Sequence, residues 1–302
     1  MPSNRRAIAA WLLAATALLG GCERGSAPVA TPTPTEPTQA VKQLVDDLRR
    51  NDLSGYARHA VPPTLHARLE TAWGEGRTRW PLTELPLDDR LPAFLTALAA
   101  PNAEKQLLTT YQRQFSGAHA ELRSAAATLG LFATQYLKKE GDYSADERAH
   151  YVQLVAALGR WGQSAPLGDV QRARKAIPQL VAAARQTGLA GGPERFQASG
   201  MDHSLERLGP FFARFKQVLS VYGLDVDASL AATEATLISQ TGDRARVQLR
   251  YTLAGQPIQA QLDMERVDGR WSPSDALRHA NAEASRPTDA APGPAEPPPP
   301  AG

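Results

Sequence analysis

The spacing of apolar residues changes once along the chain. Across residues 39–190 apolar positions recur mostly every three or four residues, which is typical of amphipathic helices. In residues 244–253 and 258–264 they recur every second residue, which is typical of strands with one buried face and one solvated face. The pattern therefore predicts an α+β fold, in which a mostly α-helical region precedes a region that contains an antiparallel sheet.

Several residues indicate where the helices begin and end. Thr38 can cap a first helix that runs through AVKQLVDDLRR. Pro92 suits the first turn of another helix, and Ser144 with Glu147 forms a capping box for a third. Breaks are expected near Pro101, Gly117, Gly141, residues 162–168 and Gly188. In the segment between two of these breaks, one helix face can be shared by Leu122, Leu129, Phe132 and Tyr136.

Residues 191–204 are interpreted as a glycine-rich break, and residues 205–280 as a helix followed by a meander of three or four strands. The helix is expected to pack against the sheet through Leu205, Leu208, Phe212, Phe215, Leu219 and Tyr222. Residues 226–239 are expected to add the first strand, and tight turns are expected at 242–243, 254–257 and 267–271. Leu249 and Tyr251 should face the core, and Arg250 should face the solvent.

Both ends of the chain have a composition that predicts no packed structure. Residues 22–38 are rich in proline and threonine, and residues 281–302 end in a proline-rich tail. Neither segment has the apolar content that a core requires. The first is expected to be an extended tether and the second a solubilising end. A ligand for a proline-binding groove is the less favoured interpretation of the tail.

The first 22 residues have the organisation of an export signal. Arg5 and Arg6 precede the apolar residues 7–19, a run shorter than the roughly twenty residues that span a membrane. The run ends in LGGC, which resembles the bacterial lipobox. The resemblance implies that residues 1–21 are a lipoprotein signal peptide, cleaved between Gly21 and Cys22. It also implies that Cys22 carries a diacylglycerol on its thiol and a fatty acid such as palmitate on its amino group. The alternative is a buried cysteine in a plain signal or a membrane anchor.

The residue after the cysteine bears on the location of the protein. In the enterobacterial sorting rule, aspartate at this position retains a lipoprotein in the inner membrane. The chain has Glu23 instead. The resemblance therefore favours a lipid anchor in the outer membrane, facing the periplasm, over the inner membrane. The membrane is the first expected partner, through the lipid on Cys22.

Charge excludes one class of partner. The chain has 33 basic and 31 acidic residues, and both arginines of residues 1–21 leave with the signal. The mature chain is then neutral, with no basic excess, so a nucleic acid partner is not expected. With one cysteine, no internal disulfide is possible, and stability must come from the core.

No sequence motif of a known chemistry is present. The chain lacks GxSxG, HExxH, a P-loop and a dinucleotide-binding fingerprint, so no cofactor is expected. The six histidines form no pair at the spacing of metal ligands on one helix. His59 and His66 are separated by Pro62 and Pro63, which break a helix between them. Neither a metal site nor a catalytic residue is therefore assigned.

Two further groups of residues are interpreted as structural. Asp46, Asp47 and Asp52 cluster near a helix end, where a solvated face is favoured over a general acid–base pair. Aromatic residues make up only 6% of the chain, so the tryptophans of the folded part are expected to anchor cores. These are Trp73, Trp80, Trp161 and Trp271. A glycan or peptide surface around the first two is the alternative.

The end of the meander, VDGRWSPSD, is similar to the C-terminal end of cone-shaped α+β domains of the nuclear-transport-factor-like superfamily. Those domains often open with a helix and an aspartate-containing turn, as in AVKQLVDDLRRNDLSGYARHA. About 150 residues of predicted helix lie between the opening and the closing pieces here. Either the intervening helices are inserted into one such domain, or the opening match is accidental. The resemblance implies a pocket in some members and only a packing surface in others, and it assigns no functional residue.

Together these features favour a lipid-anchored envelope lipoprotein that faces the periplasm. It would act as a non-catalytic binding or scaffold module, with an envelope protein as a possible partner and the helical region as the docking surface. The alternative is a hydrolase or isomerase with its active site in a cone-shaped pocket. Acids and histidines that converge in one closed cavity would favour the enzyme.

Overall fold

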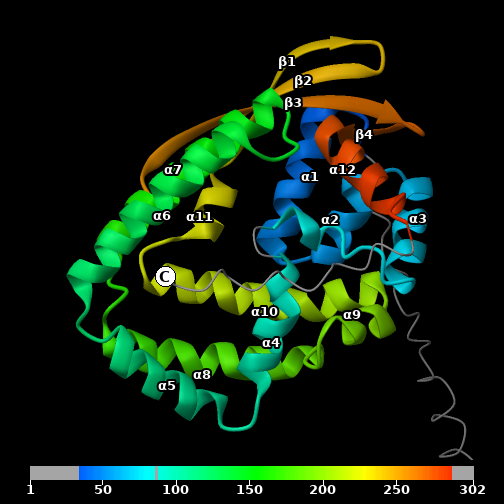
Figure 1. Cartoon of the computed structure of the whole chain (residues 1–302). Coiled ribbons are helices and arrows are strands. Elements are labelled where there is room, and N and C mark those ends of the chain that lie inside the picture. Colours follow the sequence, from blue (N-terminus) through cyan, green and yellow to red (C-terminus); the bar gives the residue numbers. More distant parts are fainter. Residues whose placement is uncertain (1–33, 86–87, 288–302) are drawn as a thin grey trace, which may run out of the picture. The chain divides into compact units, whose positions relative to one another are not determined.

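The structure is a computed structural model that describes residues 34–85 and 88–287 (Figure 1). In these ranges it is an α+β fold, as predicted, with helices first and a four-stranded antiparallel sheet near the C-terminal end. The expected signal, Gly21, Cys22 and most of the expected tether and tail lie outside the described residues. Among the described helices, none combines the length and the apolar character needed to cross a membrane.

The helices that precede the sheet follow the predicted breaks closely. They are α1 (Pro37–Arg50), α2 (Leu53–Ala60), α3 (Pro63–Gly74), the 3₁₀ helices η1 (Leu82–Glu84) and η2 (Asp88–Arg90), α4 (Leu91–Ala99), α5 (Ala103–Gln114), α6 (His119–Lys139), α7 (Ala145–Ser164), α8 (Val170–Thr187), α9 (Pro193–Ser199), α10 (Met201–Val221) and α11 (Val226–Ala231).

Two predicted caps have different outcomes. The capping box is confirmed, because Ser144 Oγ accepts from the backbone N–H of Glu147 and the Glu147 carboxylate accepts from that of Ser144. The cap at Thr38 is wrong, because α1 already begins at Pro37. Proline has a fixed φ and lacks an N–H, so it suits the first helical position and starts this helix earlier.

The sheet is a meander of β1 (Glu234–Thr241), β2 (Arg244–Leu253), β3 (Gln256–Val267) and β4 (Arg270–Pro273), in the order β1-β2-β3-β4. In β2 and β3 the side chains alternate between buried and exposed, as predicted. Leu249 is buried, Tyr251 is half-buried and Arg250 is exposed. The register is therefore the one that the sequence pattern predicts.

Helices cover one face of the sheet (Figure 1). Val41 of α1 packs with Val247 and Trp271 at one end of that face. Ala157 of α7 packs with Leu253 and Ile258 at the other end. The prediction that the long helix packs against the sheet holds only at its end, where Leu219 packs against the cluster of Leu253 and Ile258. The main neighbours of α10 are α8 and α2.

The apolar residues of α10 form two alternative stripes along the helix, and the buried stripe differs from the predicted one. Phe211 and Val218 are buried, whereas Phe215, which the prediction placed inside, is 36% exposed. Phe211 and Phe212 are adjacent, so two stripes with helical spacing run along the same helix and the sequence does not choose between them. The buried stripe meets other helices.

Three segment boundaries also differ from the predictions. Residues 226–239 hold the short helix α11 before the strand, which begins only at Glu234. The expected break at 191–204 contains α9 and the start of α10. The expected tail from 281 overlaps α12 (Ser274–Ala284), whose Ala280 and Ala284 are buried. In the last two segments buried apolar side chains, such as Phe196 of α9 and Ala284 of α12, hold a segment whose composition predicts a loop.

One large core joins the beginning and the end of the described chain. It contains residues from Leu44 of α1 to Ala284 of α12 and includes Trp73 and Trp80. The prediction that tryptophans anchor cores is confirmed for these two and for Trp271, and Trp161 is half-buried. The helical region and the region with the sheet therefore share a core.

Candidate functional sites

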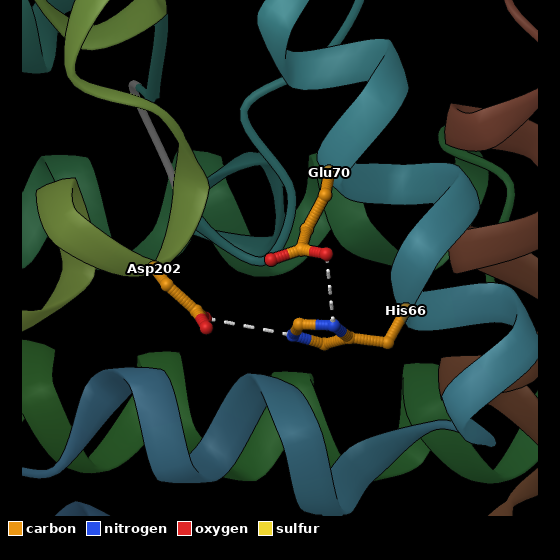
Figure 2. A group of neighbouring side chains, drawn as sticks. All are labelled: His66, Glu70 and Asp202. Carbon is orange, nitrogen blue, oxygen red and sulfur yellow. Dashed lines mark ion pairs between the residues drawn. The ribbon is translucent and has the colours of Figure 1, made fainter.

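The first candidate site joins α3 to the start of α10. His66 and Glu70 lie one turn apart on α3, and Asp202 lies in the first turn of α10 (Figure 2). Packing of α10 against α3 brings the aspartate to the histidine ring. The side chain of His66 is only 10% exposed, whereas that of Glu70 is 46% exposed. The site therefore has a buried imidazole and an open side.

The distances within this group are longer than hydrogen bonds. His66 Nε2 lies 3.6 Å from Asp202 Oδ1, and His66 Nδ1 lies 3.9 Å from Glu70 Oε2. Nε2 is buried and has no hydrogen-bond partner. Asp202, in contrast, is held in place, because it accepts from Ser54 Oγ at 3.0 Å and from Arg58 Nη1 at 3.1 Å.

The protonation of His66 follows from its surroundings. Burial lowers its pKa, and Arg58 lowers it further, while Asp202 and Glu70 oppose the shift. The net pKa lies below the ordinary value of 6.5. At neutral pH the ring is therefore uncharged, and one of its nitrogens has a free lone pair.

A second group connects α7 with α12. His279 Nδ1 lies 2.8 Å from Glu84 Oε2, and its Nε2 lies 3.7 Å from Glu147 Oε1. Arg278 donates to the other oxygen of Glu147 at 2.6 Å. Burial raises the pKa of Glu147, and the hydrogen bond to Glu84 raises the pKa of His279. Glu147 also completes the capping box of α7. The interactions of Glu147, Arg278 and His279 therefore connect α7 with α12.

The interpretation of the aspartate cluster as a solvated face is wrong for one member. Asp47 is fully buried, and its carboxylate binds Gln43, Arg50 and His59. The distance between His59 Nδ1 and Asp47 Oδ2 is 2.7 Å. Asp52 caps α2 by accepting from the backbone N–H of Gly55. Asp46 is half exposed and pairs with Arg49. The cluster therefore stabilises the turn between α1 and α2.

The third candidate site is the surface of α6. None of its residues is buried, and its main neighbour among the described elements is α7. The two helices approach closely where Gly130 faces Gly159. Four of its large apolar side chains are between 52% and 69% exposed: Leu129, Leu131, Phe132 and Tyr136. Of the face that the sequence predicts on this helix, Leu122 is half-buried and the other three residues lack a partner in the described structure.

The sequence contained part of the first site. His66 and Glu70 are four residues apart, a spacing that places them on the same side of a helix. Asp202 is more than a hundred residues away, and nothing in its local sequence connects it with His66. The residues Trp73 and Trp80 that flank a glycine- and arginine-containing segment are buried and do not form a surface.

Comparisons with known proteins give no family for this chain: no family model, curated protein or solved structure matches it.

Proposed function

We propose that this chain is a lipid-anchored envelope lipoprotein that binds an envelope protein through the exposed face of α6 and has no catalytic role. The observation that supports this proposal is that Leu129, Phe132 and Tyr136, which share one side of α6, are each more than half exposed on a helix that buries no residue. Contiguous exposed apolar surface on a soluble domain is typical of an interaction site.

The energy available to such a surface is substantial. Burial of one large apolar side chain contributes about 1.5–3 kcal/mol relative to leaving it exposed. Leu129, Phe132 and Tyr136 are spaced by three and four residues, so they share one side of α6 and can enter one groove together. A partner with a complementary apolar groove or helix therefore suits this surface.

The proposed anchor rests on the sequence of the first 22 residues. A thiol at the end of an export signal, after two glycines, has the chemistry and the access that lipid transfer requires. The lipid on Cys22 would keep the folded part near the outer membrane, facing the periplasm. Intact-mass measurement of the mature protein tests this: we expect acyl chains on residue 22, absent from Cys22→Ser. An unmodified thiol in the wild type refutes the anchor.

Docking is tested by photocrosslinking in cells. A photoreactive residue in place of Tyr136 should capture one envelope protein. Phe132→Glu should abolish the capture, because a carboxylate cannot enter an apolar interface without a partner. Leu237→Glu is the matched control, since this residue is 49% exposed on the edge strand β1, away from α6. Capture that persists in Phe132→Glu, or that the control also abolishes, contradicts the proposal.

The alternative function, a hydrolase or isomerase, has one observation in its favour. Two glutamates and a histidine meet at His279, and burial raises the pKa of one of the glutamates. A turnover that His279→Gln removes and Phe132→Glu leaves unchanged would replace the binding proposal.

A further inference from the structure

We propose that His66, Glu70 and Asp202 form a binding site for one divalent transition metal ion of the Zn²⁺ type. This inference goes beyond the proposed docking function and does not depend on it. It rests on the spacing of three ligand atoms and on a buried nitrogen without a hydrogen-bond partner.

The spacing fits a shared metal ion better than direct hydrogen bonds. Zn²⁺ binds imidazole nitrogen and carboxylate oxygen at about 2.0–2.2 Å with tetrahedral angles, which places two ligand atoms about 3.3–3.6 Å apart. His66 Nε2 and Asp202 Oδ1 are separated by 3.6 Å. One atom from each of the three residues lies within 4.8 Å of the other two. Glu70 Oε2 lies nearest the other ring nitrogen, Nδ1, at 3.9 Å, so the half-exposed Glu70 side chain has to rotate toward Nε2 to become the third ligand.

The buried nitrogen is the second observation. Nε2 of His66 is aimed at Asp202 from a side chain that is nine-tenths buried, and it has no hydrogen-bond partner (Figure 2). Buried polar atoms are paired in most native structures, so this atom needs an explanation. A metal ion between Nε2 and the carboxylates would satisfy it.

Residues around the ligands support the same geometry. Ser54 and Arg58 both donate to Asp202 and so hold its carboxylate in orientation, which is the usual arrangement around metal ligands. Arg58 is positively charged and would repel a metal ion at this site. It offsets one of the two carboxylates and leaves a net negative charge for the cation.

The ligand types select the class of metal. Ca²⁺ and Mg²⁺ prefer sites made of oxygen atoms alone, whereas imidazole suits Zn²⁺, Cu²⁺ and Ni²⁺. One nitrogen and two carboxylates leave room for water on the side where Glu70 and Asp202 reach the solvent. A site with three protein ligands and an open fourth position is therefore expected.

The test uses the full mature chain, prepared free of metal. Zn²⁺ is titrated in competition with a chromophoric chelator, and Co²⁺ is titrated with detection of its visible absorption. We expect one equivalent of each metal, and an absorption of the intensity that four-coordinate Co²⁺ gives. Ca²⁺ should not compete.

Variants then assign the site. Glu70→Gln and Asp202→Asn should each lower the affinity for Zn²⁺ by at least about 10–100-fold, the usual loss even for residues that only support metal ligands. Glu70 is half exposed, so its variant should keep the circular dichroism spectrum of the wild type. Zn²⁺ should raise the melting temperature of the wild type and not that of Glu70→Gln.

The chain also has a matched control. His203 and Glu206 on α10 are likewise 3.9 Å apart, but both are more than half exposed and neither belongs to the three-ligand group. His203→Gln should leave Zn²⁺ binding unchanged. The proposal is overturned if no saturable binding occurs, if Glu70→Gln binds as the wild type does, or if His203→Gln removes the binding. In the first two cases His66 is a core histidine only.

Discussion

Lys216 is a buried lysine that joins α10 to the end of α1. Its side chain is 1% exposed. The Nζ donates to the backbone carbonyls of Leu48 and Arg49, each at 3.1 Å, and to the carboxylate of Asp227. All three of its N–H groups therefore have acceptors, and two of these acceptors lie at the C-terminal end of α1, where carbonyls lack partners within the helix. We predict that Lys216→Met destabilises the protein.

The magnitude follows from the groups left behind. Methionine keeps most of the volume of the lysine stem, so a large cavity is not expected. The carbonyl of Arg49 loses the donor that Lys216 provides, which costs about 1–3 kcal/mol, whereas the carbonyl of Leu48 keeps the backbone N–H of Asn51. Loss of a positive charge at a helix C-terminus adds about 0.3–1 kcal/mol. Removal of the desolvated ammonium offsets part of this cost. We therefore expect a decrease of about 1–3 kcal/mol in the free energy of unfolding.

The assay is urea denaturation of the mature chain, followed by circular dichroism. The midpoint should fall while the dependence on urea stays constant, which marks a change in stability alone. Asp227→Asn is the control. It keeps an oxygen acceptor, and its side chain is 50% exposed, so it should cost less than about 1 kcal/mol. A Lys216→Met variant within about 0.5 kcal/mol of the wild type refutes the reasoning. If Asp227→Asn is as costly as Lys216→Met, the ion pair and not the carbonyl bonds is responsible.

Two other predictions concern the sheet and the helix α7 that covers it. Burial lowers the pKa of His150 to about 4, from an ordinary value of 6.5. Between these values the unfolded chain binds a proton that the folded chain does not. As the pH falls from 7 to 4, this residue therefore lowers the free energy of unfolding by up to about 3 kcal/mol. His150→Gln should reduce that fall in urea denaturation between pH 7 and 4, and an unchanged pH profile would contradict the shift. Leu249→Ala should cost about 2–5 kcal/mol and Arg250→Ala less than about 0.5 kcal/mol; equal losses in thermal unfolding would mean that the register is wrong.

The meander was predictable because its signals are local. Alternation in β2 and β3 fixes which side chains are buried, and glycine at residues 242, 255 and 269 has positive φ in each turn. A residue with positive φ in such a turn needs the conformational freedom of a glycine backbone. The glycines in the sequence therefore indicate the turn positions, and these positions set the register. The capping box of α7 is local in the same sense.

What could not be predicted depends on contacts between distant segments. The apolar residues of α10 allow two stripes, and only packing against α8 and α2 decides which is buried. Asp47 resembles a surface acid until packing of α2 against α1 brings His59 to it. Asp202 joins His66 only because α3 and α10 pack together. Charged residues of this kind have no sequence signal that separates a buried partner from a solvated one.

The contact between α1 and the sheet joins two segments that are far apart in the sequence. Val41 of α1 packs with Val247 and Trp271, although the segment from α2 to α10 separates them along the chain. The first helix and the last strands of the described chain are therefore held together by one apolar cluster.

The two proposed sites can be tested independently, because they use different helices. The metal ligands lie on α3 and α10, whereas the docking surface lies on α6, whose main neighbour is α7. Substitutions at distant sites that share no partner usually act additively. Phe132→Glu should therefore leave Zn²⁺ affinity unchanged, and Glu70→Gln should leave crosslinking through α6 unchanged. If Glu70→Gln weakens the capture as well, the metal must influence the docking surface through the body of the fold, and metal binding would then regulate the partner.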